Sequence, residues 1–580
     1  MTDKQTIETD VVVVGSGGAG LTAAVVAATQ GMRVLLLEKT EYFGGTTALS
    51  GGGVWVPCNS LASEAGLIDD PQLALQYAEE VVGPTVRRDL LRAFIDAAPR
   101  MVDYLHDHTC VRFAVQRGFA DWHPHVLGAS TDGRLLCPVE FDGRELEDYF
   151  PQLRPPLTEF NAPGGMMFSI ADMPHITRVT QSFSSFKHIA RLALRFAFDR
   201  LRHPRGTRLT MGNAMAGRLL RSALDAGVEL WKDTPMLELI SEGGAIKGVV
   251  ALREGQPIEI RARRGVVLAT GGFSANEVMR RQYFPFAEHH VSLVPEGNTG
   301  DGLQQAQSVG GRFDGDNLSN AGWVVVSVLR QANGKLRKFP HLYMDRGKPG
   351  CIAVNQQGQR FGNEATTNLV EAMHRTGSVP AHLICDHRFI KKYGLGLVRP
   401  GGWGLKRLIG AGYILVAPTL EALAILIGVS PDNLLASVTR FNAQAITGVD
   451  DDFHRGRDKG DLPLGDPAHK PNPCLGPISD GPFYAVKIFP GDSTTTVGLR
   501  IDQKARVLDT HDQPIPGLHA VGLDMNSLWR GRAPGNGANN TLSLTFGYLA
   551  GMHLAMEGIT APPPPASQKQ EKESLDGHVH

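Results

Sequence analysis

Three glycines near the start of the chain have the spacing of a nucleotide-binding turn. They follow the valines of residues 11–14 and form the pattern G-x-G-x-x-G. The first glycine permits a tight turn, the second lets a diphosphate approach the main chain, and the third lets the next helix pack against the strand. The free N–H groups that begin this helix then face the phosphates. The sequence predicts diphosphate contacts from Gly15, Gly17, Gly18, Ala19 and Gly20.

An acidic residue follows where dinucleotide-binding proteins hold a ribose. Glu38 ends the predicted strand Val34–Leu37, and its carboxylate can accept hydrogen bonds from ribose hydroxyls. This fingerprint fits NAD as well as FAD. The glycine and hydroxyl residues that come next favour FAD, because their backbone can follow a longer dinucleotide to its flavin. The predicted contacts in this stretch are Lys39, Gly44, Gly45, Thr46, Thr47, Ser50, Gly51 and Gly52.

Later segments are predicted to return to the same cofactor. A strand over residues 265–270 ends in a glycine pair, and Asp301 opens a helix in its first turn, where a carboxylate is favoured. Near the end, a glycine-rich turn precedes the predicted helix 541–556, whose N-terminus can direct amides at the flavin. The predicted contacts are Gly271, Gly272, Asp301, Gly522, Asp524, Gly537, Asn540 and Leu542.

Other side chains could act on a substrate. Arg530 and Arg532 precede the last glycines, and an arginine binds a carboxylate through a bidentate pair; the alternative is a structural ion pair at a domain interface. His123 could act as a base near neutral pH, or be merely solvated. Tyr484 and Tyr343 are further hydrogen-bond donor candidates, with a place in the core as the alternative.

Composition limits the class of protein. The 580 residues suggest two domains, and a formal net charge of −1 argues against a nucleic-acid partner. No run of about 18 apolar residues predicts a transmembrane segment, and a polar N-terminus argues against a signal peptide, so a cytoplasmic location is expected. The six cysteines lack metal-binding spacing, and we expect no metal.

The order of the predicted strands and helices that must position these residues indicates an α/β protein. We expect a Rossmann-like FAD-binding domain with an inserted α+β substrate (catalytic) domain. The first part of the FAD-binding domain covers residues 1–272, with a loop-rich excursion at about 110–205. The substrate domain covers residues 273–490, residues 491–560 complete the FAD-binding domain, and residues 561–580 form a disordered tail.

Two segments inside these domains have further patterns. Residues 191–205 combine five arginines with periodic apolar residues and predict an amphipathic helix, which could touch a membrane or a partner or be a solvated helix face. Residues 354–364 predict a hairpin in which Arg360 and Glu364 are close enough to pair.

These pieces, in this order, resemble the fumarate reductase and 3-ketosteroid Δ1-dehydrogenase superfamily of FAD flavoproteins, and the ketosteroid branch most closely. The resemblance is carried by residues 43–57 (FGGTTALSGGGVWVP), 264–273 (RGVVLATGGF), 298–302 (NTGDG), 449–456 (VDDDFHRG) and 481–485 (GPFYA). It implies a flavoenzyme that removes two hydrogens from adjacent carbons beside a carbonyl. Such a reaction needs a base, donors for the enolate oxygen and a flavin that accepts hydride.

The chain departs from the ketosteroid pattern where tyrosines would fill the base and donor roles. These positions correspond to Ala533, to the vicinity of Asn368, and to the loop Trp122-His123. We therefore expect a dehydrogenase of a cyclic ketone or, as an alternative, a fumarate reductase-like enzyme for a carboxylate-bearing enoate or cyclic keto acid. A third alternative is a non-catalytic FAD-binding protein. The electron acceptor and the oligomeric state do not follow from the sequence.

Overall fold

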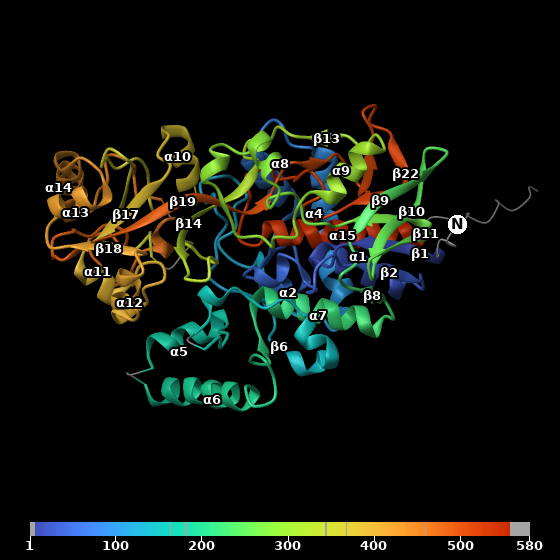
Figure 1. The fold of residues 1–580 in the computed structure, drawn as a ribbon, viewed down its shortest axis with the longest axis horizontal. Coiled ribbons are helices and arrows are strands. Elements are labelled where there is room, and N and C mark those ends of the chain that lie inside the picture. The colour runs from blue at the N-terminus through green and yellow to red at the C-terminus, as the bar shows by residue number, and fades with distance from the viewer. Residues whose placement is uncertain are drawn as a thin grey trace, which may run out of the picture.

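The computed structural model describes residues 6–556, except residues 163, 180–181, 343–344, 367 and 459. The described chain is elongated, with one large sheet toward each end (Figure 1). Segments from both ends of the sequence share the first sheet, and the middle of the chain builds the second. Tyr343 and the predicted tail at residues 561–580 lie outside the described residues.

The first sheet has eight strands in the order β21-β22-β11-β1-β2-β8, with β10 paired to β11 and β9 paired to β10. Its central strands are parallel, and the four valines of β1 are buried on both faces, as parallel strands covered by helices require. The strands are β1 (Thr6–Val14), β2 (Val34–Leu37), β8 (Glu229–Trp231), β9 (Met236–Glu242), β10 (Ala245–Arg253), β11 (Gln256–Leu268), β21 (Arg506–Leu508) and β22 (Pro514–Ala520).

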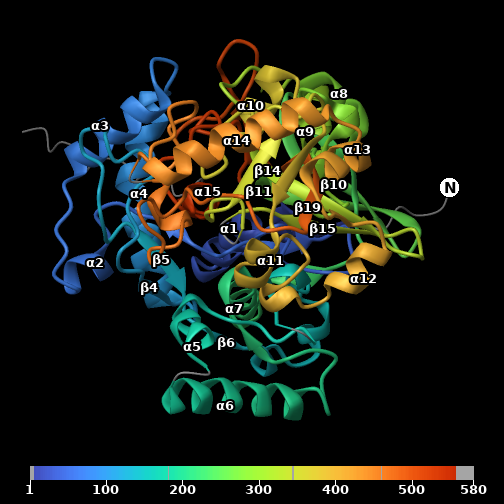
Figure 2. The same ribbon diagram turned by 90° about the vertical axis from the view of Figure 1, so that its left-hand side faces the viewer.

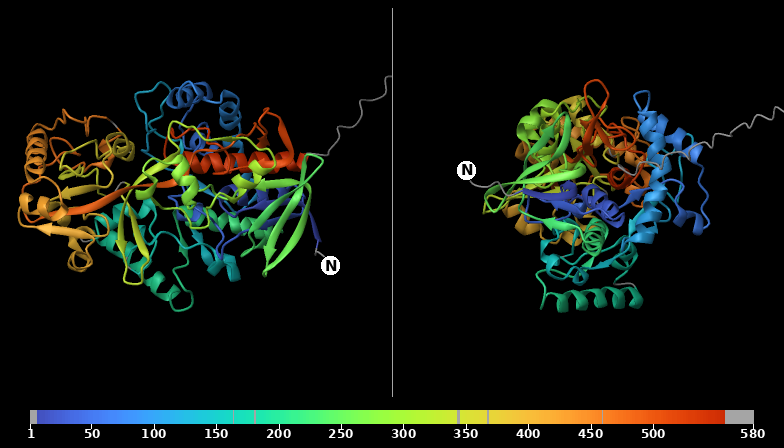
Figure 3. Two further views of the ribbon diagram at one scale, coloured as in Figure 1. Left: turned by 45° about the horizontal axis from the view of Figure 1, so that its top comes forward. Right: turned by 90° about the vertical axis from the view of Figure 1, so that its right-hand side faces the viewer.

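Helices surround this sheet, and the helix after the glycine turn packs against the last described helix of the chain (Figure 3). The helices of this part are α1 (Gly18–Thr29), α2 (Ser60–Glu64), α3 (Pro71–Val82), α4 (Arg88–His108), α7 (Met211–Asp225), α8 (Glu277–Tyr283), α9 (Asp301–Ser308) and α15 (Ala538–Met556). This arrangement confirms the predicted Rossmann-like α/β fold.

The second sheet has seven strands in the order β15-β14-β19-β17-β16, with β12 and β18 also paired to β19. Its strands are β12 (Val291–Ser292), β14 (Ala321–Arg330), β15 (Leu336–Pro340), β16 (Cys351–Val354), β17 (Ala381–Cys385), β18 (Ile414–Ala417) and β19 (Phe483–Thr495). Its helices are α10 (Leu369–Thr376), α11 (His387–Lys392), α12 (Leu405–Gly410), α13 (Leu420–Ile427) and α14 (Pro431–Thr447). Strand β19 continues past the predicted domain boundary at residue 490 and reaches the first sheet's domain.

The predicted loop-rich excursion contains regular structure. Three short strands pair as β3 (Val54–Trp55), β5 (Leu135–Pro138) and β4 (Phe113–Val115). Strands β6 (Phe141–Asp142) and β7 (Arg208–Leu209) pair at the base of an arm, residues 142–208, that carries α5 (Met173–Thr177) and α6 (Phe183–Asp199). Helix α6 begins eight residues before the helix predicted at Arg191, and it lies apart from both sheets (Figure 2).

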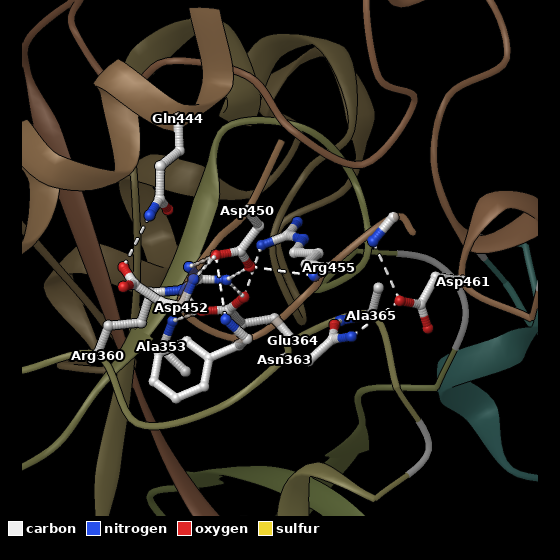
Figure 4. Close-up of polar contacts among 12 residues, drawn as sticks. Ala353, Arg360, Asn363, Glu364, Ala365, Gln444, Asp450, Asp452, Arg455 and Asp461 are labelled. Carbon is white, nitrogen blue, oxygen red and sulfur yellow. Dashed lines mark hydrogen bonds and ion pairs between the residues drawn. The ribbon is translucent and has the colours of Figure 1, made fainter. Parts of the chain in front are cut away.

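A buried charge network lies beside the second sheet (Figure 4). Arg360 forms ion pairs of 2.8 Å with both Glu364 and Asp450, which confirms the predicted pairing, and Arg455 lies 2.9 Å from Glu364. Burial would raise the pKa of Glu364, but the charges of Arg360 and Arg455 lower it to about 2. The network joins β16 to residues 450–461, where Asn363 also donates to Asp461 at 2.8 Å.

Candidate active site

The glycine turn after β1 leaves room for a ligand only on one side. Gly15 has a φ of 107°, and a Cβ there would lie 2.2 Å from the carbonyl oxygen of Ala269. A Cβ on Gly20 would lie 2.0 Å from the carbonyl oxygen of Gly15, whereas a Cβ on Gly17 would meet nothing within 4 Å. No side chain caps α1 at Gly17. The backbone N–H of Gly18 donates to the hydroxyl of Thr47 at 2.9 Å, and the helix N-terminus at Gly17 otherwise faces open space, as a diphosphate site requires.

A cleft of about 810 Å³ begins at this turn. Twelve of the residues predicted to contact the cofactor line it: Gly15, Gly17, Gly18, Ala19, Glu38, Lys39, Gly45, Thr46, Thr47, Gly271, Asp301 and Gly522. The sequence analysis missed Arg154 and Asn298, which also line the cleft. Arg154 belongs to the excursion and leaves its Nε buried without a hydrogen-bond partner. The shape, the open amides and this donor fit the diphosphate and ribose of FAD.

Glu38 lies at the cleft with its carboxylate already oriented. One oxygen accepts a hydrogen bond from the hydroxyl of Ser16 at 2.5 Å, and the other accepts one from the backbone N–H of Thr40 at 2.9 Å. Beside it, the Nζ atom of Lys39 lies 2.6 Å from a carboxylate oxygen of Asp301. These contacts fix the acidic side chain at the end of β2, where the ribose prediction requires it.

The other predicted cofactor residues do not line this cleft. They are Gly20, Gly44, Ser50, Gly51, Gly52, Gly272, Asp524, Gly537, Asn540 and Leu542. Gly537 packs against the backbone of Gly53, where a Cβ would lie 2.3 Å from the carbonyl group, and the amide of Asn540 donates to the Gly53 carbonyl at 3.0 Å. Leu542 is buried in the core of the domain.

Asp524 is a predicted cofactor contact whose carboxylate makes its hydrogen bonds within the protein. Its carboxylate is fully buried and accepts hydrogen bonds from the hydroxyl of Thr270 at 2.8 Å and from the backbone N–H of Gly272 at 3.0 Å. Burial raises the pKa of Asp524, and the hydrogen bonds from Thr270 and Gly272 oppose this rise. Asp524 therefore holds the chain at the end of β11 and has no free oxygen aimed at a cofactor.

The loop that carries His123 is tied to the loop that carries Arg532. The backbone N–H of Trp122 donates to the carbonyl of Pro534 at 3.1 Å, and the His123 ring makes a hydrogen bond with the backbone of Ala533. Burial lowers the pKa of His123, and the charges of His125 and Arg532 add to this effect. The structure thus brings together two of the positions that the resemblance singled out, Trp122-His123 and Ala533.

Arg532 faces this group with a free guanidinium. Its side chain is exposed and makes no hydrogen bond or ion pair with any described residue. Across from it, Glu371 lies in the first turn of α10 and makes a hydrogen bond with Ser319. Burial raises the pKa of Glu371, while the positive charge of Arg532 partly opposes the rise. The candidate active site therefore combines an imidazole, a cation and a carboxylate from two domains.

Near Arg532, sequence reasoning missed Glu371. The resemblance pointed to the vicinity of Asn368, which is the N-cap of α10. Residues three apart share one face of a helix, so a carboxylate one turn after Asn368 was the available signal.

Two predicted catalytic residues, Arg530 and Tyr484, make contacts outside the group formed by His123, Arg532 and Glu371. The guanidinium of Arg530 donates to the backbone carbonyl of Asp316 at 2.5 Å, so it fixes a neighbouring segment instead of facing a substrate. Tyr484 is buried in the second sheet, with its hydroxyl 3.1 Å from Nδ1 of His387. It precedes Thr495 by eleven residues on β19, which separates it from the first domain by roughly 35 Å at the usual rise of a strand. Both side chains thus have contacts within the protein, and their catalytic roles stay predictions.

No helix among the described residues is both long and apolar enough to cross a bilayer. Within the same residues, no cluster of three or more histidine, cysteine or acidic side chains could hold a metal ion.

Comparisons with known proteins agree with this geometry. A family model described as FAD binding domain matches residues 10–539. The chain is 38% identical to 4-oxocyclohex-2-ene-1-carboxylate 5-dehydrogenase of Sinomonas cyclohexanicum, over 95% of this chain and 94% of the relative. It is 34% identical to 3-oxosteroid 1-dehydrogenase of Mycobacterium tuberculosis, over 94% of this chain and 98% of the relative.

A solved structure is similar throughout. The 3-ketosteroid Δ1-dehydrogenase of Sterolibacterium denitrificans, in complex with 1,4-androstadiene-3,17-dione, superposes with a TM-score of 0.87. The two sequences are 36% identical, and the match covers 94% of this chain and 99% of that chain. This chain therefore belongs to the FAD binding domain family and is an FAD-dependent dehydrogenase that acts on CH–CH bonds.

Proposed function

We propose that this enzyme desaturates the bond next to the ketone of a six-membered cyclic keto acid, of the 4-oxocyclohexenecarboxylate type. The observation that carries the proposal is the free guanidinium of Arg532 beside His123. An arginine without a protein partner, in a candidate active site, is suited to a bidentate pair with a carboxylate. The relative from Sinomonas cyclohexanicum, whose name specifies such a substrate, supports the choice.

His123 is the proposed base for the proton next to the ketone. Its hydrogen bond to the backbone of Ala533 uses one ring nitrogen and leaves the other to accept a proton. Because the pKa of His123 is lowered, the ring is neutral and ready to accept at neutral pH. FAD, when bound, supplies the hydride acceptor for the adjacent carbon.

The alternative substrate is a steroid ketone, which has no carboxylate for Arg532. The resemblance places a tyrosine of the ketosteroid branch where this chain has Ala533. A small side chain there gives no hydroxyl to the site, and the neighbouring arginine supplies a charge that a neutral steroid does not use. Both features favour the keto acid.

Anaerobic reduction of the bound flavin tests the proposal. We would mix the holoenzyme with 4-oxocyclohex-2-enecarboxylate, with its methyl ester and with a 3-ketosteroid. The acid should reduce the flavin fastest. Arg532→Ala should lower kcat/KM for the acid about 10- to 150-fold, the range for loss of a charged hydrogen bond, and leave the ester unchanged. Arg532→Lys, which keeps the charge, should lose less. Reduction by the steroid alone, equal in wild type and Arg532→Ala, would contradict the proposal.

A further inference from the structure

The side of helix α6 that faces the protein combines polar and apolar side chains, since Leu192 and Phe196 line a small pocket there. On its inner face, His188 lies 2.7 Å from Asp172, and Arg195 lies 3.0 Å from Asp142. Asp199 accepts a hydrogen bond from the hydroxyl of Thr207 at 2.8 Å. The only fully buried side chain among the seventeen residues of α6 is that of Ser185. Polar contacts therefore help to fasten this helix to the arm, and its remaining apolar side chains are left for the opposite side.

The apolar side of α6 faces outward. Phe183 is 81% exposed, and Leu201, just after the helix, is 79% exposed. Between them, the side chains of Phe186, Leu194 and Phe198 are also exposed. At about 100° per residue these positions fall on one stripe. We call Phe183, Phe186, Leu194, Phe198 and Leu201 the outer face of α6. Figures 1 and 2 show this helix at the edge of the molecule, with no other element across it.

Basic side chains border the outer face on both sides. Arg191 and Arg202 follow one border of the stripe, Lys187 lies just inside that border, Arg200 follows the other border, and all four are exposed. The only acidic residue between positions 183 and 202 is Asp199, which is turned inward. An apolar stripe flanked by cations is the pattern of a helix that lies in the interface of a membrane.

We propose that the outer face of α6 binds the surface of an anionic lipid membrane. The phenylalanine and leucine side chains enter the boundary between headgroups and acyl chains, and the four flanking cations pair with anionic headgroups. A second copy of the chain is a poorer occupant, because a symmetric contact would place these cations against their own copies. The arm thus anchors the enzyme on a membrane that it does not cross. This proposal does not depend on which ketone the enzyme oxidises.

Vesicle flotation of the flavin-loaded enzyme tests the proposal. The wild type should float with phosphatidylcholine vesicles that contain phosphatidylserine, and much less with phosphatidylcholine alone. Added salt should weaken the binding. The double variant Phe183→Ser/Phe198→Ser should stay in the unbound fraction. Arg191→Glu/Arg202→Glu should bind at least about 25-fold more weakly, because each basic residue near an anionic surface contributes about a factor of five.

A matched control is Ile446→Ser on α14, where an isoleucine is 74% exposed away from the arm. This variant should float like the wild type. The flavin absorption spectrum reports folding of each variant independently of turnover. The proposal is overturned if the wild type does not float with anionic vesicles, or if the phenylalanine variant floats equally well. It is also overturned if the wild type forms a dimer in sedimentation that Phe183→Ser/Phe198→Ser abolishes, without any vesicle binding.

Discussion

The backbone N–H of Trp122 donates to the carbonyl of Pro534 at 3.1 Å, and this bond joins two loops more than four hundred residues apart in sequence. The hydroxyl of Tyr77 donates to the same carbonyl at 2.6 Å. Because these bonds hold the loops by their backbones, His123 keeps its place beside Arg532 whatever side chain occupies either position. Substitutions of these two residues should therefore report on chemistry more than on folding.

Replacing His123 should remove the proposed base. We expect His123→Gln to lower kcat by about 10²- to 10⁴-fold, the usual contribution of a general base. The lowered pKa of His123 keeps the ring neutral, so wild-type kcat/KM should be flat near neutrality and fall only below about pH 6.5. In His123→Gln, this fall of kcat/KM at low pH should be absent. His125→Gln, a change at the exposed neighbour, is the control and should retain activity. An unchanged pH profile in His123→Gln would assign the proton to another group.

Glu371 should weaken the hold of Arg532 on a substrate carboxylate, because its negative charge competes for the same cation. Glu371→Gln keeps the side-chain shape and removes the charge. We expect KM for the keto acid to fall about two- to five-fold, with little change for the methyl ester, a range typical of one partly screened charge. Steady-state kinetics with both compounds would measure this effect. An increase in KM for the acid would show instead that the Glu371 carboxylate orients Arg532.

The close contact at Gly15 predicts loss of the cofactor on the smallest substitution. In Gly15→Ala the new methyl group would lie 2.2 Å from the carbonyl oxygen of Ala269, at a φ of 107°. The turn must then move, and we expect the purified variant to contain little flavin. Gly31→Ala is the control, because Gly31 also has a positive φ, of 86°, but its Cβ would meet nothing within 4 Å. Flavin content measured by absorbance should remain normal in that variant.

The buried network around Glu364 predicts acid-dependent stability. The pKa of Glu364 is lowered from 4.5 to about 2, so its contribution is complete above pH 4.5 and lost as the pH falls toward 2. Glu364→Gln should destabilise the protein by about 3–5 kcal/mol at neutral pH, because it leaves the buried charge of Arg455 without its carboxylate partner. The same substitution should also make the free energy of unfolding fall less as the pH is lowered from 4.5 toward 2. Denaturant unfolding followed by tryptophan fluorescence measures both effects.

A surface pair provides the contrast to that network. The half-exposed side chain of Asp512 forms ion pairs of 3.2 Å with Arg312 and of 2.8 Å with Arg500. Asp512→Asn should change stability by less than about 1 kcal/mol, since solvent screens such pairs. If Glu364→Gln and Asp512→Asn lowered the free energy of unfolding by similar amounts, burial would not make the Glu364 network more stabilising than a surface ion pair.

The sequence by itself determined the parts of this protein that depend on neighbouring residues. The valines of β1, the glycines at positions 15, 17 and 20, and Glu38 form a strand, a turn, a helix and a second strand within forty residues. Backbone sterics and local hydrogen bonds determine the fold of such a unit, and the glycine motif in it predicts the ligand. The ion pair of Arg360 with Glu364 was predictable for the same reason, because the two residues are only four positions apart in the sequence.

The tertiary structure alone decided which candidate side chains share a site. Arg530 and Arg532 are two residues apart, yet a left-handed backbone at Arg530 turns one guanidinium to Asp316 and leaves the other free. Tyr484 lies far from the first domain because it stands near the start of the long strand β19. Only the other end of this strand reaches the first domain. Glu371 and the polar anchors of α6 likewise depend on contacts between segments distant in sequence. Spacing along the chain does not encode such contacts, since they follow from how whole elements pack.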